Sequence, residues 1–151
     1  MGSRINLGKA TPDAYKAVLG LEQAASAAAK KAGLADGLTH LLRLRASQIN
    51  QCAFCVKMHA ADALKAGEPI ERLSVLPAWR ETEYFTPKER AALALTEAVT
   101  LVSTGQVPDE VYESAAQELS GEELAAVEWI AIVINTWNRV AIASRYEVGP
   151  S

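Results

Sequence analysis

The chain has 151 residues, half of them hydrophobic and 22% charged, and its formal net charge at pH 7 is −3. This composition is typical of a globular domain and excludes a disordered chain, while the lack of a basic excess argues against nucleic-acid binding. The length fits one domain with its own core.

The pattern predicts an all-α protein. Alanine-rich stretches such as "AASAAAKK" favour helix, and no run of alternating Val, Ile and Thr indicates a strand. We treat residues 1–35 as an N-terminal helical segment and 36–151 as the core of the same single domain. Helices are expected at residues 12–32, 36–50, 52–66, 70–79, 87–104, 108–118 and 121–146.

Capping residues set these limits. Thr86 with Glu89, and Ser120 with Glu123, have the spacing of a capping box, in which two side chains bind free backbone N–H groups of the first helical turn. Helix ends are predicted at Gly33, Gly67 and Gly105.

The segment "SQINQCAFCVKMH", residues 47–59, contains both cysteines and one of the two histidines. With Asn50 as N-cap, a helix starting near Cys52 would place Cys52, Cys55 and His59 on one face. The helix dipole would then favour a thiolate, and the imidazole would lie within reach of the Cys55 proton. A nucleophilic thiol with a base and a second thiol is the arrangement that redox chemistry requires.

Two alternatives remain at this point. Cys52, Cys55 and His59 would form a Cys₂His₂ metal site if His40 joined them, although such sites usually occur in small loop-rich modules. Both cysteines would otherwise be inert core residues.

The last predicted helix is apolar around most of its circumference, which indicates burial in the core or in a subunit interface. Four aromatic residues are candidates for lining a substrate channel, but core or interface packing is the commoner role of such residues. They are Trp79, Tyr84, Phe85 and Trp137.

The first fifteen residues contain no apolar stretch of signal-peptide length, and polar residues interrupt "WIAIVINTWNRVAIA" well short of a membrane span. We therefore expect a cytoplasmic protein that does not enter membranes. In that reducing compartment a cysteine pair is more often catalytic or metal-binding than a permanent disulfide.

The stretch "LLRLRASQINQCAFCVKMHAADALKAGE" resembles the core motif of the AhpD-like alkylhydroperoxidases of the carboxymuconolactone decarboxylase superfamily. The Ser-Gln-Ile-Asn lead-in, the Cys-x-x-Cys pair and the histidine four residues later match that family's spacing. The resemblance continues through "LPAWRETEYFTPKERAALALTEAVTLV" and "INTWNRVAIASR", and covers roughly residues 36–146.

This resemblance implies an all-helical fold that assembles into trimers or hexamers, with peroxidase and disulfide-reductase activity in antioxidant defence and no cofactor or bound metal. It implies that Cys55 attacks the hydroperoxide and becomes a sulfenic acid, and that Cys52 resolves it as a disulfide. His59 would belong to the proton relay to Cys55. An external dithiol would then reduce the pair.

The chain departs from the family at one position. AhpD-like enzymes carry a relay glutamate twelve residues before the first cysteine, where this chain has His40. An imidazole can shuttle protons near neutral pH, but it brings no fixed negative charge. His40 is thus either a relay residue or a surface or interface histidine without a role, and Ser47 is expected near its helical face. The superfamily also contains the carboxymuconolactone decarboxylases themselves, which lack the Cys-x-x-Cys pair. The presence of the pair here therefore argues against lactone decarboxylation.

Overall fold

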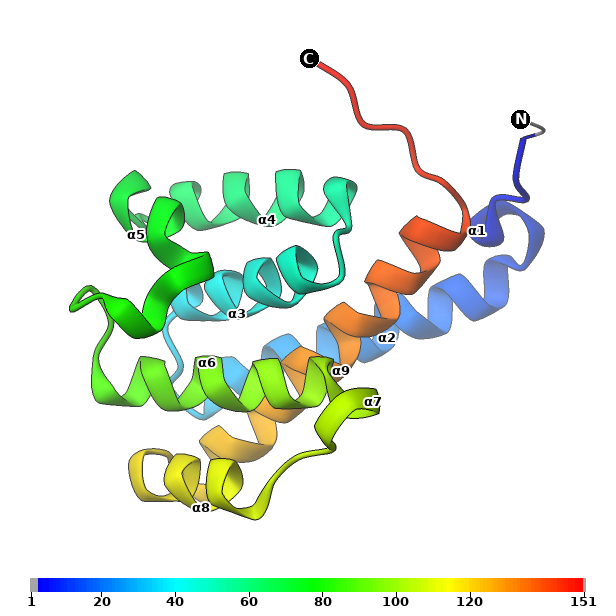
Figure 1. The fold of residues 1–151 in the computed structure, drawn as a ribbon. Coiled ribbons are helices and arrows are strands. Elements are labelled where there is room, and N and C mark those ends of the chain that lie inside the picture. Colours follow the sequence, from blue (N-terminus) through cyan, green and yellow to red (C-terminus); the bar gives the residue numbers. More distant parts are fainter. Residues whose placement is uncertain (1–2, 151) are drawn as a thin grey trace.

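The helices begin and end close to the predicted limits. The computed structural model describes residues 3–150, in which every regular element is a helix (Figure 1). In chain order they are α1 (Leu7–Ala10), α2 (Pro12–Lys31), α3 (Asp36–Ile49), α4 (Ala53–Lys65), α5 (Ile70–Val75), the 3₁₀ helix η1 (Leu76–Glu81), α6 (Pro87–Thr100), α7 (Val102–Gly105), α8 (Asp109–Glu118) and α9 (Gly121–Ala143).

Both predicted capping boxes are confirmed. The Glu89 N–H donates to the Thr86 hydroxyl and the Thr86 N–H donates to the Glu89 carboxylate, and Ser120 and Glu123 repeat this arrangement at the start of α9. Gly33 and Gly67 have positive φ angles of 84° and 94° just past α2 and α4. Glycine adopts this backbone conformation without steric cost, which explains these two helix ends.

Three local differences from the predicted elements have physical causes. Asn6 caps a short helix, α1, that the sequence pattern did not indicate. The predicted helix 70–79 ends its α-helical part at Val75, because Pro77 cannot donate the next backbone hydrogen bond. The predicted helix 87–104 is interrupted at Leu101, just after Thr100 turns its hydroxyl back onto the carbonyl of Thr96.

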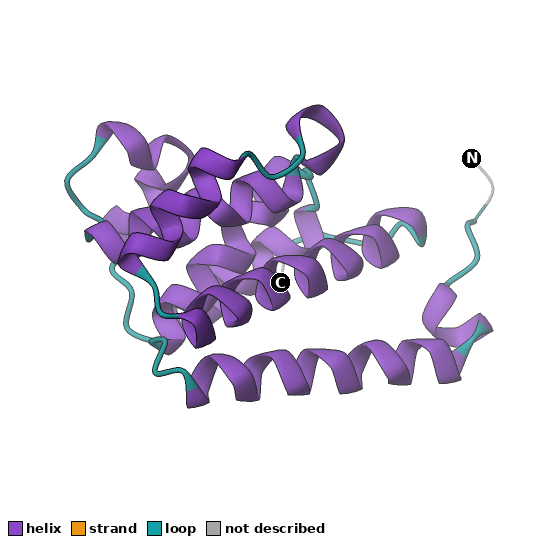
Figure 2. Cartoon of the chain, turned by 90° about the horizontal axis from the view of Figure 1, so that it is seen from below, coloured by secondary structure: helices purple, strands orange, loops and turns teal. Residues whose placement is uncertain are grey.

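Helix α3 lies in the middle of the molecule and packs against α4, α6 and α9. Figure 1 shows α3 and α4 side by side, with α9 crossing the bundle and α8 at its far end beside α6. Helix α2 packs along α9, and seen from below it forms one long side of the molecule (Figure 2). The N-terminal segment is therefore part of the bundle and reaches the region beside α4.

The buried apolar side chains form two groups. The larger group joins α3, α6 and α9 through residues such as Leu41, Leu93 and Ile130. The smaller group contains Cys52 and Cys55 together with Ala46, Ile134 and Ala141. Both thiols thus lie in a small core of their own between α3, α4 and α9.

In the single chain, α9 is buried along one side only. Ile130, Val133 and Ile134 are buried, whereas Trp129, Ile132 and Ile142 are 46%, 41% and 43% exposed. The apolar circumference therefore has two parts, one in the core and one on the surface. None of the described helices combines the length and the apolar character that crossing a membrane requires.

Candidate active site

The turn between α3 and α4 places both cysteines. Asn50 ends α3, Gln51 has a positive φ of 56°, and the backbone N–H groups of Gln51 and Cys52 donate to the carbonyls of Gln48 and Ser47. This is the Schellman arrangement that closes a helix C-terminus. The expected N-cap role of Asn50 is therefore wrong. Cys52 is the N-cap of α4 and lies outside the helix, while Cys55 lies in its first turn.

The two sulfur atoms lie side by side in the interior. Cys52 Sγ and Cys55 Sγ are 2.7 Å apart, and each residue is 1% exposed. A disulfide needs a separation of about 2.05 Å, so a small movement would join them. Both cysteines are free in this structure.

The expected lowering of the Cys55 pKa is wrong. Burial raises the pKa of the Cys55 thiol to about 12, and the hydrogen bond with Cys52 acts in the same direction. Desolvation disfavours a buried anion more than the helix N-terminus favours it here. In the resting molecule the thiol therefore holds its proton, and attack on a substrate needs a base that removes it.

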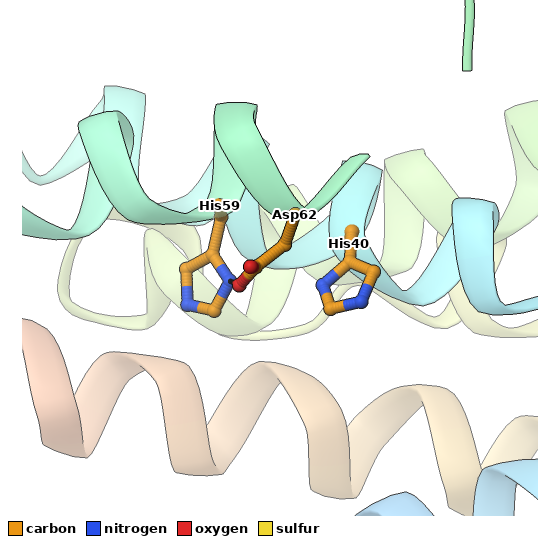
Figure 3. A group of neighbouring side chains, drawn as sticks. All are labelled: His40, His59 and Asp62. Carbon is orange, nitrogen blue, oxygen red and sulfur yellow. Dashed lines mark ion pairs between the residues drawn. The ribbon is translucent and has the colours of Figure 1, made fainter. Parts of the chain in front are cut away.

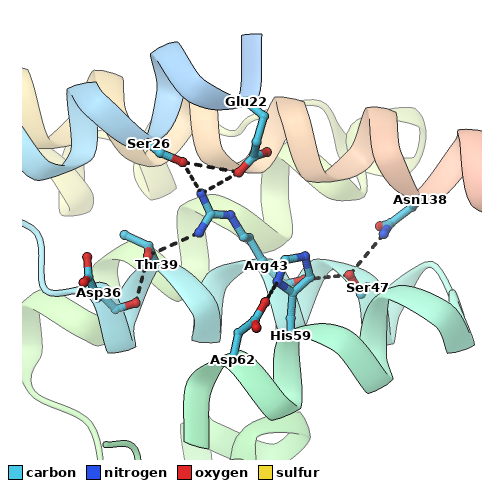
Figure 4. Close-up of polar contacts among 9 residues, drawn as sticks. All are labelled: Glu22, Ser26, Asp36, Thr39, Arg43, Ser47, His59, Asp62 and Asn138. Atoms are coloured by element: carbon cyan, nitrogen blue, oxygen red, sulfur yellow. Dashed lines mark hydrogen bonds and ion pairs between the residues drawn. The ribbon is translucent and has the colours of Figure 1, made fainter. Parts of the chain in front are cut away.

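A side-chain amide of α9 counters part of this effect. A hydrogen bond from Asn138 lowers the pKa of Cys55. Asn138 is completely buried and donates to Ser47 Oγ at 3.0 Å (Figure 4). It also accepts from Asn50 Nδ2 at 2.9 Å. It thus connects α9 to the end of α3 and to the thiol. The sequence pattern did not indicate a role for this residue, because an asparagine in an apolar helix carries no local signal of what it contacts.

His59 lies on the face of α4 that carries Cys55, one turn further along. Its side chain is 9% exposed, and its Nδ1 lies 3.6 Å from Asp62 Oδ2 without forming a hydrogen bond. Burial, followed by the nearby positive charge of Arg43, lowers the pKa of His59 to about 3, so the ring is neutral at pH 7. No hydrogen bond joins its ring to Cys55 Sγ in the described chain. Both residues line the same cavity.

His40 lies on α3 and faces the same region. Its ring stacks on that of His59 with 6.0 Å between centroids, and burial and Arg43 lower its pKa. Ligand atoms of His40, His59 and Asp62 all lie within 4.8 Å of one another, and Figure 3 shows the Asp62 carboxylate between the two rings. His40 is partly buried and lies beside His59.

The expected neighbour Ser47 takes a different role. Its hydroxyl donates to the Arg43 carbonyl at 2.7 Å and accepts from Asn138. It therefore stabilises the end of α3 and forms no hydrogen bond with His40 in the described chain. The alternative Cys₂His₂ cluster does not form in the described residues, where the group of possible metal ligands contains His40, His59 and Asp62 and neither sulfur.

A buried cation lies beside the imidazoles. Arg43 is 5% exposed, and its guanidinium donates to Glu22 and Ser26 at 2.9 Å each, and to Thr39 at 3.4 Å (Figure 4). The Glu22 carboxylate offsets its charge. This group ties α2 to α3, and the positive charge of Arg43 adds to the effect of burial in lowering the pKa of both rings.

An apolar cavity of about 310 Å³ opens onto Cys55 and His59. Helix α2 contributes Tyr15 and Leu19, α4 contributes Met58, and α9 contributes Trp137. Among the four aromatic residues considered from the sequence, Trp137 lines this cavity. Trp79 and Phe85 lie in the core, and Tyr84 is 51% exposed.

Cys52 faces a separate, smaller cavity. This cavity of about 170 Å³ is lined by Gln51, Cys52 and Arg145 among others. Phe54 and Tyr146 line both cavities, and their rings meet edge to face with 5.0 Å between centroids. The sulfur pair is thus approached from two sides, Cys55 through one cavity and Cys52 through the other.

Comparison with known proteins agrees with this architecture. A model of the carboxymuconolactone decarboxylase family matches residues 12–98, so the match already begins at the start of α2. The uncharacterized protein YdfG of Bacillus subtilis (strain 168) is 35% identical over 143 residues, which is 95% of each chain. A crystal structure from Agrobacterium tumefaciens superposes with a TM-score of 0.89 at 37% identity, covering 99% of this chain and all of that one. That protein, of unknown function, is described as a candidate antioxidant defence protein AhpD.

The raised pKa of Cys55 has a direct chemical consequence. The rate of Cys55 alkylation by iodoacetamide should rise roughly tenfold per pH unit from pH 7 to pH 9 without a plateau, because only the thiolate reacts. Mass spectrometry of the peptide that contains both cysteines locates the label. A short cysteine peptide is the control, with a plateau near its own pKa of about 8.5. A plateau for Cys55 below pH 8 would show that the protein lowers this pKa.

Proposed function

The chain belongs to the carboxymuconolactone decarboxylase family as an AhpD-like member, and on that premise we propose that it is a thiol peroxidase that reduces hydroperoxides in antioxidant defence. The observation that carries the proposal is the pair of free thiols 2.7 Å apart, one of which shares an apolar cavity with a neutral imidazole. A nucleophile, a resolving thiol and a base are then all present.

In the proposed reaction, the Cys55 sulfur attacks one oxygen of the hydroperoxide. The S–O bond forms as the O–O bond breaks, so Cys55 becomes a sulfenic acid and the other oxygen leaves as an alcohol or water. Cys52 then attacks the Cys55 sulfur, a disulfide forms, and a second oxygen leaves as water. An external dithiol reduces the disulfide by exchange and is itself oxidised.

The proton of Cys55 needs an acceptor, because the thiol is not ionised at rest. We assign this role to His59, which lines the same cavity, with the proton passing on to the departing oxygen. An imidazole with a pKa near 3 is a weak base unless its charged form is stabilised during the reaction. Asp62, 3.6 Å from the ring, supplies a carboxylate for that purpose.

The family carries a relay glutamate at the position of His40 on α3. In our proposal Asp62, on α4, takes over the role of that glutamate. The carboxylate reaches the imidazole from α4 itself, three residues after His59, instead of from α3. His40 then packs against the relay ring and takes part in proton transfer only through it.

The shape of the cavity supports an organic hydroperoxide as substrate, with hydrogen peroxide as the smallest member of the class. Its wall is mostly apolar, with Tyr15, Leu19, Met58 and Trp137 around the opening to Cys55. Apolar side chains of this kind bind an alkyl group and leave the peroxide at the thiol. The dithiol would approach Cys52 through the smaller cavity, next to Arg145.

We further propose a homo-oligomer, trimeric or hexameric, and a cytoplasmic location. The exposed apolar side chains of α9, Trp129 and Ile132 among them, supply a surface for subunit contact. A reducing compartment keeps both thiols available for the cycle.

One alternative has a specific observation in its favour. A thiol whose pKa is raised to about 12 reacts slowly, which suits a redox sensor that is oxidised once and then read by a partner. Steady-state turnover with hydroperoxide and a dithiol separates the two functions, because a sensor gives one oxidation per chain and no sustained turnover. Lactone decarboxylation has no role for the thiol pair and is not proposed.

Replacement of the cysteines tests the assigned roles. Cys55→Ser should abolish hydroperoxide consumption, because the variant lacks the attacking sulfur. Cys52→Ser should still consume one equivalent and stop at a sulfenic acid on Cys55, which dimedone labels and mass spectrometry detects. Full turnover by Cys55→Ser would refute the assignment of the nucleophile.

A second set of variants tests Asp62 as the residue that positions and stabilises His59. Asp62→Asn should lower kcat at least about tenfold with little change in KM, and Asp62→Glu should restore part of it. Asp36→Asn is the matched control, since Asp36 lines the neighbouring polar cavity but lies outside the group of His40, His59 and Asp62.

The family glutamate provides a rescue experiment. His40→Glu introduces a carboxylate at the position where relatives carry one, so the double variant His40→Glu/Asp62→Asn should regain activity that Asp62→Asn has lost. Equal rates for wild type and Asp62→Asn would show that Asp62 takes no part in the proton relay. An unchanged rate in His40→Glu would show that residue 40 takes no part in it.

A further inference from the structure

The side chains of His40, His59 and Asp62 form a compact group of metal-binding atoms. One atom from each residue lies within 4.8 Å of the other two, and the carboxylate lies between the two rings (Figure 3). The residues come from two helices, α3 and α4, which pack side by side. The group is therefore fixed by the fold and does not depend on a loop.

Two buried nitrogen atoms in this group lack partners. His40 Nδ1 and His59 Nδ1 are inaccessible to solvent and make no hydrogen bond in the described structure. Buried ring nitrogens nearly always have a partner, because leaving one unsatisfied costs about 1–3 kcal/mol. The His59 side chain is 91% buried, with 9% of its surface exposed, and its free nitrogen faces Asp62. Two convergent unsatisfied nitrogens beside a carboxylate indicate that something else binds there.

We propose that His40, His59 and Asp62 bind a divalent transition-metal ion of the zinc type. Two imidazoles and one carboxylate are a common three-ligand set for such an ion, with solvent or another small ligand in the fourth position. The adjoining cavity of about 300 Å³ provides room for that fourth ligand. Neither cysteine belongs to the site.

The distances allow this coordination after a small adjustment. Ligand atoms around a tetrahedral zinc ion lie about 3.4 Å apart, because each bond is about 2.0–2.1 Å long. The ligand atoms of His40, His59 and Asp62 now lie up to 4.8 Å apart, so movements of roughly 1 Å would bring them to this spacing. The Asp62 side chain is 34% exposed and can rotate, whereas His59 is held in place. The carboxylate would thus complete the site around the more rigid imidazole.

The surrounding charge permits a cation. Three carboxylates line the polar cavity, those of Glu22, Asp36 and Asp62, against the cations Lys30 and Arg43. Arg43 is the closest unfavourable charge, but it is paired with Glu22 at 2.9 Å. The carboxylates that line the cavity therefore outnumber its cations. The negative charge of Asp62, which would bind the ion directly, would partly offset the repulsion between the ion and Arg43.

The proposed ion would compete with the proposed relay. A metal on Nδ1 of His59 leaves the other ring nitrogen as an N–H donor, which cannot accept the Cys55 proton. Bound metal would then hold the thiol pair in its unreactive form, and removal of the metal would release it. This consequence rests on the proposed peroxidase function, whereas the binding itself does not.

The test uses the full chain with Cys52→Ser and Cys55→Ser, so that thiols cannot bind the metal. Isothermal titration calorimetry with Zn²⁺ should give one site per chain in this background. Adding His40→Gln or Asp62→Asn should weaken binding at least about tenfold, since loss of even a supporting residue usually costs 10–100-fold. Adding Asp36→Asn, the matched control, should leave affinity within about twofold, and circular dichroism checks that each variant is folded.

Co²⁺ spectra identify the ligands in the wild-type chain. Visible bands without an intense near-ultraviolet sulfur-to-cobalt band would support a site made of imidazole and carboxylate. A sulfur-to-cobalt band, absence of binding in the chain without cysteines, or equal loss in Asp36→Asn would each refute the proposal. A chain that binds Zn²⁺ as expected but consumes no hydroperoxide would refute the peroxidase function and leave the metal site intact.

Discussion

The site depends on the way one buried amide holds the turn between α3 and α4. Asn138 on α9 forms hydrogen bonds with Ser47 and Asn50. Asn50 is the C-cap of α3, so this contact fixes the end of α3, and Cys52 follows two residues later as the N-cap of α4. Gln51 takes a left-handed backbone conformation in this turn, which is unfavourable for a residue other than glycine. Contacts elsewhere in the fold must offset that cost. With this turn fixed, the two sulfurs are held 2.7 Å apart in a small core. The position of the thiols is thus a tertiary property, imposed from a helix more than eighty residues away in sequence.

Burial also sets the protonation of the site. It raises the pKa of Cys55 and lowers the pKa values of His40 and His59, so the resting molecule holds a thiol and two neutral rings. Arg43 strengthens the effect on both rings, and Glu22 from α2 keeps Arg43 buried. Such a site does not carry a preformed ion pair. In our proposal charge develops only when a hydroperoxide occupies the cavity, where Asp62 stabilises the imidazolium that forms.

The features that could be predicted from the sequence are those that local interactions determine. The capping boxes at Thr86 and Ser120 bound helices α6 and α9 as expected, because each involves residues only three apart. The sharing of a helical face by Cys55 and His59 also followed from spacing alone. The N-cap of α4 was predicted wrongly, as Asn50 and not Cys52, because Gln51 gives no glycine-like signal for the turn between them. Asn138 was missed, and the direction of the Cys55 pKa was wrong, because both depend on burial and on contacts between helices. Asp62 was also missed, although its position three residues after His59 on the same helix was a local signal.

The most direct test of the account is the number of free thiols before and after one equivalent of an alkyl hydroperoxide. We expect the reduced chain to have two titratable thiols under denaturing conditions. Both should be lost after oxidation, and dithiothreitol should restore both. That result would mean that Cys55 and Cys52 act as one redox pair. Loss of a single thiol, or of none, would contradict the claim that these two residues form the reactive centre.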